Sequence, residues 1–123
     1  MDERLERTVV KFVQTLFEGR YSDAERIAEN LEKRSKGELD AVVSKVLKGL
    51  HLAYTTDDSA SLIHKIYSSD NPKSELERYV SSMRDANGDL EEASTIIEVW
   101  DVILKNFERL PIPDRYERKS TTS

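Results

Sequence analysis

Residues 90–110, near the C-terminus, constrain the fold most, because their apolar side chains fall on two faces of one helix. One face carries Leu90, Ala93, Ile97, Trp100, Leu104 and Phe107, and the other carries Ile96, Val99, Val102 and Ile103. A helix at the surface of a globular protein has one apolar stripe, so a helix with two stripes must be covered on more than one side. We therefore expect a long C-terminal helix at the centre of the domain.

Apolar residues at helical spacing recur along the rest of the chain, as in Leu5, Val9 and Phe12. Gly19 suits the end of a helix, because glycine adopts the left-handed conformation without a steric penalty, and Asn71-Pro72 suits a helix start. No run of alternating apolar and polar residues indicates a strand. The chain is therefore predicted to be all-α, a compact bundle of about six antiparallel helices. We expect these helices over residues 2–18, 22–34, 35–53, about 62–66, 71–87 and 89–110.

The length of 123 residues suits one domain. We expect a single helical domain over residues 1–112 and a polar, disordered tail over residues 113–123, because Pro111 and Pro113 end the last helix. No run approaches the roughly 18 apolar residues that cross a bilayer, and the charged first residues do not resemble a signal peptide. We expect a cytoplasmic protein without membrane contact.

The sequence indicates neither an enzyme nor a metal site. It contains no cysteine, which excludes disulfides, thiolate metal sites and cysteine nucleophiles. The two histidines, His51 and His64, have no histidine or acidic residue three or four positions away, the spacing at which a helix binds a metal with two side chains. No Gly-x-Ser-x-Gly motif and no glycine-rich phosphate loop is present. We therefore expect a non-catalytic protein that needs no cofactor and no metal.

The turn between the first two expected helices has Gly19, Tyr21 and Ala24 at the spacing G-x-Y-x-x-A. Over this one turn the chain resembles a tetratricopeptide repeat. The repeat also has a tyrosine where this chain has Thr15 and a proline where it has Lys36, and no second copy of the turn follows about 34 residues later. We interpret the motif as a general turn between two helices.

Basic residues gather at several places, although the formal net charge is −5. Arg4, Arg7 and Lys11 share one face of the first expected helix, and Lys45 and Lys48 are neighbours on the third. If the fold brings them together, these five side chains can follow a phosphate backbone. A nucleic-acid-associated accessory protein is therefore the alternative function, although acidic residues flank each cluster and the net charge opposes approach to a polyanion.

Apolar residues outside the main stripes indicate surface that a partner covers. Val10 and Phe17 lie off the stripe of the first expected helix, and Leu52 lies off that of the third. Val99 and Val102 belong to the second apolar face of the last helix. Since exposed apolar patches usually mark interfaces, we expect these residues to bind a protein partner or a second copy of the chain. The predicted function is non-catalytic protein–protein interaction, as an adaptor or a small subunit of a complex.

Overall fold

The computed structural model describes residues 1–35, 37–87 and 91–116. Two short 3-10 helices, η1 (Phe107–Arg109) and η2 (Asp114–Tyr116), lie near the C-terminus. No strand occurs in these ranges, so the prediction of an all-α fold is confirmed. The six α-helices are α1 (Glu3–Phe17), α2 (Tyr21–Lys33), α3 (Glu38–Thr55), α4 (Leu62–Tyr67), α5 (Pro72–Asn87) and α6 (Glu91–Lys105).

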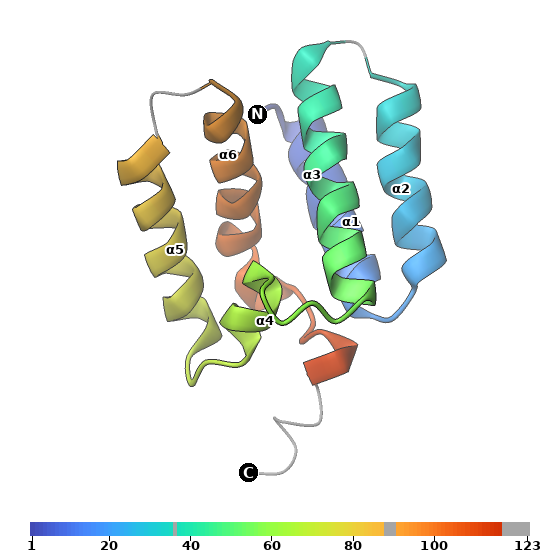
Figure 1. Cartoon of the computed structure of the whole chain (residues 1–123). Helices are drawn as coiled ribbons and strands as arrows, with labels where there is room; N and C mark the ends of the chain where they lie inside the picture. Colours follow the sequence, from blue (N-terminus) through green and yellow to red (C-terminus); the bar gives the residue numbers. More distant parts are fainter. Residues whose placement is uncertain (36, 88–90, 117–123) are drawn as a thin grey trace.

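The helices form two groups that meet at α6. Figure 1 shows α1, α2 and α3 side by side, running alternately down and up, and α5 and α6 as a second antiparallel pair. The short α4 crosses the lower end, between α3 and α5. α6 packs against α1, α3 and α5, so it is covered on more than one side, as its two apolar faces predicted.

The expectation of a long C-terminal helix is wrong. α6 has 15 residues, whereas α3 has 18 and α5 has 16. The helix ends at Lys105, and the side-chain amide of the next residue, Asn106, donates to the Val102 carbonyl oxygen at 2.8 Å, a local side-chain bond typical of residues at helix ends and turns. Phe107, the next apolar residue of the pattern, lies in the tight turn of η1 and not in α6.

Local sequence signals explain several helix ends. The Asp2 carboxylate accepts a hydrogen bond from the Leu5 backbone N–H at 2.8 Å, which caps α1. The Asn71 side chain accepts from the Ser74 backbone N–H at 3.2 Å, which caps α5. Gly19 has a φ of +85°, a left-handed conformation that suits glycine and ends the α1 segment.

The core is built by all six helices and fixed by polar contacts from α3. The fully buried Ser44 hydroxyl donates to the Ala28 carbonyl oxygen of α2 at 3.1 Å. The buried Asp40 carboxylate accepts from Arg4 Nη2 of α1 at 3.2 Å. Because buried polar groups need partners, these bonds select one arrangement of α1, α2 and α3. Around them lie, among others, Leu5, Val9, Phe12, Leu16, Leu47, Ile66, Leu76, Val99 and Ile103.

The C-terminal segment is held against the α1–α2 turn. The Asp114 carboxylate accepts a hydrogen bond from the Tyr21 hydroxyl at 2.9 Å and another from the buried Tyr54 hydroxyl. Gly19 makes room for this carboxylate, because a Cβ at that position would lie 2.9 Å from Asp114 Oδ2. We call these four residues the Asp114 clasp.

Tyr116 fastens the same segment to α4. Its ring stacks on the ring of Tyr67 with centroids 5.7 Å apart, and its hydroxyl lies 3.2 Å from His64 Nδ1. Pro113 is buried. The tail expected from residue 113 thus has defined contacts as far as Tyr116, and residues 117–123 lie outside the described residues. No helix in the described ranges has both the length and the apolar character needed to cross a bilayer.

Candidate protein-binding surface

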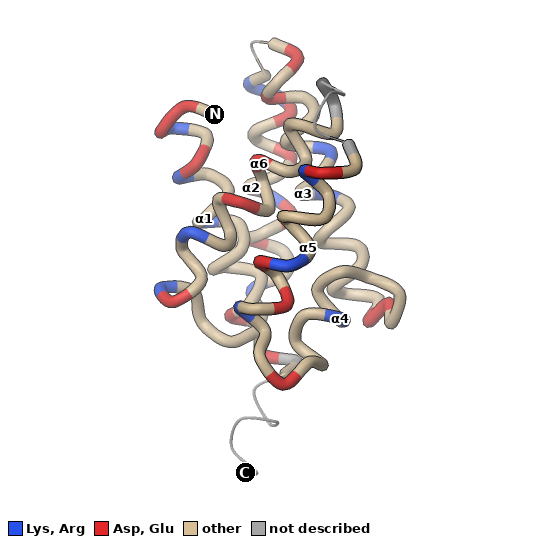
Figure 2. The backbone as a smooth tube through the Cα atoms, turned by 90° about the vertical axis from the view of Figure 1, so that its left-hand side faces the viewer, with Lys and Arg blue, Asp and Glu red and all other residues tan. Residues whose placement is uncertain are grey.

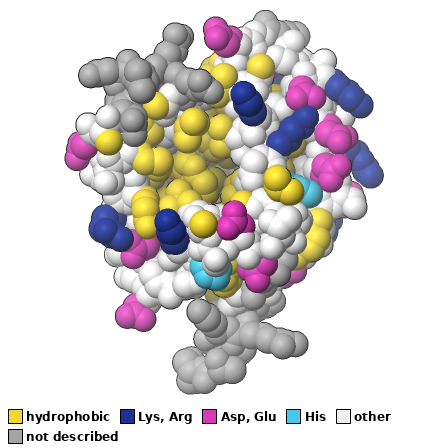
Figure 3. Space-filling model, in the orientation of Figure 1, with side chains coloured by type: hydrophobic (Ala, Val, Ile, Leu, Met, Phe, Trp, Pro, Cys, Tyr) yellow, Lys and Arg dark blue, Asp and Glu magenta, His cyan; other side chains and the backbone are white. Residues whose placement is uncertain are grey.

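An apolar hollow lies between the two helix groups. Figure 3 shows hydrophobic side chains gathered in a hollow on the face that Figure 1 presents, between α3 and the α5–α6 pair. α6 packs against both α3 and α5, whereas α3 and α5 make no extensive contact with each other. α3 and α5 therefore form two walls, and α6 lies at the floor.

The α3 wall is an apolar stripe on the side of the helix turned away from α2. Leu39, Val42 and Val46 follow the spacing i, i+3, i+7, which places them on one side of α3. Leu39 is 38% exposed, and Val42 and Val46 are half-buried. The face that carries Ser44 and His51 contacts α2 instead. The stripe is thus apolar surface that the α1–α2–α3 group leaves partly uncovered.

Half-buried apolar side chains also occur on the other two helices. Tyr79 and Met83 lie one turn apart on α5, and Ile96 lies near the start of α6. Met83 and Ile96 pack against the core and keep part of their surface outside it. Methionine adapts its shape to different partners because its chain is unbranched and flexible.

Three residues expected at an interface are core residues. Phe17 is 1% exposed, Val99 is fully buried and Val102 is 3% exposed, so none of them is available to a partner in this structure. Periodicity revealed that their helices have apolar faces beyond one stripe, and neighbouring helices cover those faces. Val10 is half-buried in a shallow hollow beside α1, and Leu52 is 63% exposed on α3. The structure does not place these two in a common hollow.

Apolar spacing in the sequence does not distinguish the residues of the α3 wall from the core residues of the same helix. Val42 and Val46 belong to the broad apolar stripe of α3, in which Val43, Leu47 and Leu50 are buried. The width of that stripe was the available signal, because it exceeds what one neighbouring helix covers. Which edge of the stripe stays uncovered depends on the position of α5.

The five basic residues expected to bind nucleic acid do not form one surface. Arg4 and Lys11 line a hollow between α1 and α2. Lys48 lies beside the other flank of α2, where its ammonium is 2.7 Å from a Glu32 oxygen. Lys45 is exposed elsewhere on α3.

Acidic side chains neutralise much of the remaining basic charge. Arg7 forms an ion pair with Glu3 at 3.0 Å along α1. On the side of the molecule drawn in Figure 2, Lys and Arg residues alternate with Asp and Glu residues along α1 and α5. Such alternation produces little of the one-sided field that attracts a polyanion.

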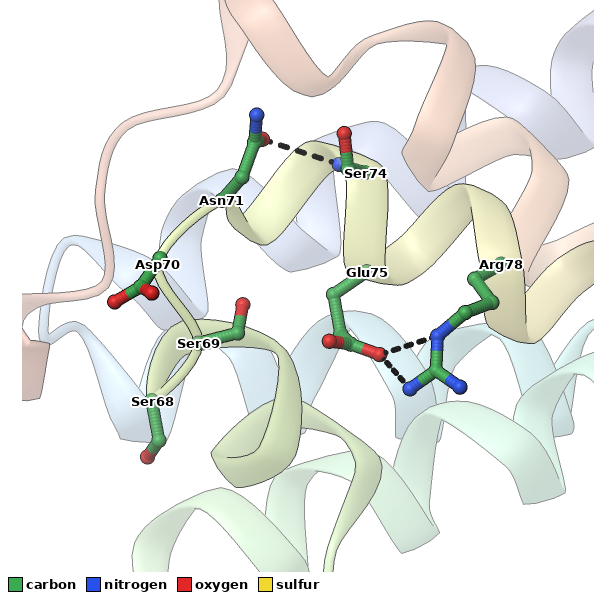
Figure 4. Close-up of a pocket in the computed structure, with 7 residues that line it drawn as sticks. All are labelled: Ser68, Ser69, Asp70, Asn71, Ser74, Glu75 and Arg78. Carbon is green, nitrogen blue, oxygen red and sulfur yellow. Dashed lines mark hydrogen bonds and ion pairs between the residues drawn. The ribbon is translucent and has the colours of Figure 1, made fainter.

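A polar hollow lies at the turn between α4 and α5, with a volume of about 480 Å³ (Figure 4). The Asn71 side chain is occupied by the Ser74 N–H, and the Glu75 carboxylate accepts from Arg78 Nε at 2.8 Å. These groups therefore serve the start of α5. The hollow is lined by Ser68, Ser69, Asp70, Asn71, Ser74, Glu75 and Arg78.

Both histidines are engaged in contacts with the chain itself. His51 Nε2 lies 2.9 Å from the Tyr21 carbonyl oxygen, so this nitrogen donates a hydrogen bond to the backbone. His64 Nδ1 lies beside the Tyr116 hydroxyl. Within the described part of the chain, no three His, Asp or Glu side chains are grouped as metal ligands. Burial raises the pKa of the Tyr67 hydroxyl far above its ordinary value, because it disfavours the charged form.

The geometry therefore offers contact surfaces more clearly than reactive groups. The apolar hollow is the surface of this kind that Figure 3 displays. Comparisons with protein-family models, with curated proteins and with solved structures found no match to this chain.

Proposed function

We propose that this chain is a non-catalytic, cytoplasmic protein-interaction module, an adaptor or a small subunit of a complex. Its partner contributes an amphipathic helix that lies in the apolar hollow between α3 and α5. The observation that carries the proposal is the arrangement of the hollow, in which two helices stand apart over a third and the exposed side chains are apolar.

The length of the α3 wall suits a helical partner. From Leu39 to Val46 the helix rises about 10 Å, or two turns. A partner helix presents its own apolar anchors at i, i+3, i+4 and i+7, which span the same distance. A docked helix would meet α3 and α5 with its two flanks, and α6 with its inner face.

The available apolar area supports a binding free energy of moderate size. Fully burying an apolar side chain contributes roughly 1.5–3 kcal/mol, and the half-buried residues of the hollow have only part of that left to gain. Several such gains must offset the lost freedom of the two partners. We therefore expect a dissociation constant near the micromolar range, which corresponds to a binding free energy of about −8 kcal/mol.

The environments of the histidines support binding over catalysis. A general base needs a free ring nitrogen within reach of a substrate. The His51 side chain is only 16% exposed, with Nε2 held by the Tyr21 carbonyl, so little of its ring is open to a substrate. His64 serves the packing of Tyr116 against α4.

Two leucines on α3 provide a matched test of the hollow. Leu39 belongs to the wall, whereas Leu52 is 63% exposed on another side of the same helix. Leu39→Glu and Leu52→Glu change charge and size equally, and both side chains are exposed enough for the chain to fold. Circular dichroism and thermal melting verify the folding of both variants.

The assay is affinity capture from native extract of the source organism, carried out with and without nuclease treatment and followed by mass spectrometry. We expect the wild type and Leu52→Glu to capture the same protein, and Leu39→Glu to lose it. Capture that Leu39→Glu leaves intact, or capture that nuclease abolishes, contradicts the proposal.

The oligomeric state identifies the source of the helix. If sedimentation shows a dimer of the pure chain that Leu39→Glu disrupts, the occupant of the hollow is a second copy. If the pure chain is monomeric while capture depends on Leu39, the helix belongs to another protein. In both cases the complex should weaken little as salt rises, because apolar burial supplies the affinity.

A further inference from the structure

A second hollow, between α1 and α2, is lined by cations. Its volume is about 200 Å³, below the 300–1,000 Å³ of pockets that hold whole drug-sized ligands. Its polar lining consists of Arg4, Thr8 and Lys11 from α1, Asn30 from α2, and Arg34, which directly follows α2. We call it the basic hollow.

Helix geometry brings these side chains together. Arg4, Thr8 and Lys11 follow the spacing i, i+4, i+7 on one side of α1. Asn30 lies on α2 one turn before Arg34, the residue that caps the end of that helix. Between the two rows lie Ile27 and the nearly buried Leu31. An apolar floor strengthens electrostatic attraction, because it keeps water from one side of a bound ion.

The basic hollow differs from its neighbours in having no acidic residue in its described lining. The hollow between α2 and α3 contains Glu25 and Glu29, and the polar hollow of Figure 4 contains Asp70 and Glu75. The charges of α2 are separated onto two sides of the helix. Its glutamates Glu25, Glu29 and Glu32, at the spacing i, i+4, i+7, face α3 and therefore lie away from the basic hollow. Among the described residues, neither Lys11 nor Arg34 has an ion-pair partner.

Arg4 is held in position beside this hollow. Its Nη2 atom contacts both oxygens of the buried Asp40 carboxylate, at 3.2 and 3.4 Å. A guanidinium has five N–H donors, and this contact uses only one of its nitrogens. The Arg4 side chain remains 60% exposed. The hollow is lined by three cationic side chains, and the Asp40 carboxylate pairs with one of them, Arg4. Two positive charges, on Lys11 and Arg34, are therefore left unbalanced.

We propose that the basic hollow binds a phosphate group. A phosphate dianion matches the two unbalanced charges, and its oxygens accept hydrogen bonds from guanidinium, ammonium, hydroxyl and amide donors of the kind that line the hollow. The small volume admits the phosphate and leaves the rest of the ligand outside. This site lies away from the apolar hollow, so it is independent of the proposed partner.

The test is a titration of the labelled protein with inorganic phosphate, followed by amide NMR near neutral pH at constant ionic strength. We expect saturable shifts centred on Thr8, Asn30 and Arg34. The double variant Lys11→Gln, Arg34→Gln should bind roughly tenfold more weakly, because it loses two exposed, solvent-screened charge contacts that each contribute a few-fold. Far-ultraviolet circular dichroism checks that this variant folds, which its exposed positions favour.

A matched control removes the same charge elsewhere. Lys45→Gln, Lys65→Gln changes two exposed lysines on α3 and α4 that do not line the hollow. This control should bind phosphate within about twofold of the wild type, since distant exposed charges are screened by salt. Shifts that never saturate, or equal weakening in both double variants, would mean diffuse attraction to the surface and would overturn the proposal.

Two further probes identify the source of the phosphate. Glycerol 3-phosphate represents a soluble phosphate monoester, and phosphatidylcholine vesicles containing about one-fifth phosphatidic acid represent a lipid headgroup. Binding of either probe that requires Lys11 and Arg34 supports the site and names its source. Binding of neither, like the absence of a response to phosphate, refutes it.

Discussion

The contact of Gly19 with Asp114 predicts a specific coupling between two distant parts of the chain. Gly19 has a φ of +85°, and a Cβ added there would lie 2.9 Å from Asp114 Oδ2. That carboxylate accepts hydrogen bonds from the Tyr21 and Tyr54 hydroxyls. Gly19→Ala should therefore strain the backbone and also push Asp114 away from its tyrosine donors.

The magnitude follows from these two effects. A non-glycine residue in the left-handed region costs roughly 1–2 kcal/mol, and a hydrogen bond to a charged group contributes about 1.5–3 kcal/mol. We expect Gly19→Ala to lower the free energy of unfolding by about 2.5–5 kcal/mol. When Asp114→Ala is already present, the new Cβ meets no carboxylate, so only the backbone cost of about 1–2 kcal/mol should remain.

Urea unfolding of the wild type, the two single variants and the double variant measures this coupling, with Trp100 fluorescence as the probe. Gly49→Ala is the control, because Gly49 lies within α3 and an added Cβ there meets nothing within 4 Å. That substitution should stabilise the protein by about 0.5–1 kcal/mol through helix propensity. Strictly additive costs for Gly19→Ala and Asp114→Ala would refute the Asp114 clasp.

Three further predictions concern the core and the pH dependence. Trp100→Ala should lower the free energy of unfolding by about 3–5 kcal/mol, whereas Leu52→Ala should change it by less than about 0.5 kcal/mol; equal effects in urea unfolding would contradict the assigned core. Burial raises the pKa of Tyr67 above its value of about 10 in the unfolded chain, so the free energy of unfolding should fall as pH rises beyond roughly 10. Tyr67→Phe should remove the part of this fall that Tyr67 causes, and an unchanged pH profile of stability in that variant would contradict the prediction. The Lys73 ammonium, 2.8 Å from Glu108, lowers the pKa of the Glu108 carboxyl. Lys73→Met should therefore raise that pKa towards its ordinary value, as measured by carbon-detected NMR. The small stabilisation that the ion pair provides should disappear as pH falls through the Glu108 pKa.

The helices themselves could be predicted from the sequence because the interactions that define them are local. Asp2 and Asn71 cap helices through bonds to residues three positions ahead, and Gly19 ends a segment through its own conformational freedom. The expected start of the second helix at residue 22 is one residue late, because α2 begins at Tyr21 without a side-chain cap. Local reasoning also extended the last helix past Asn106.

The interaction surfaces could not be predicted in this way. Periodicity indicates how much of a helix is apolar, but it does not indicate which residues a neighbouring helix covers. Phe17 and Val99 are buried because other helices cover them, whereas Leu39 and Val46 stay partly exposed because α5 does not cover them. The orientation of the charged side chains also depends on residues far away in the sequence, since Arg4 is oriented by Asp40, 36 residues further along the chain.

By itself the sequence thus determined an all-helical chain, most helix boundaries and a last helix that must be covered on several sides. Only the tertiary structure decided which apolar edge remains open, which cations share a hollow and where the C-terminal segment docks. The physical reason is the range of the forces involved. Helix hydrogen bonds and caps act over three or four residues, whereas burial and charge pairing depend on which helices become neighbours in space.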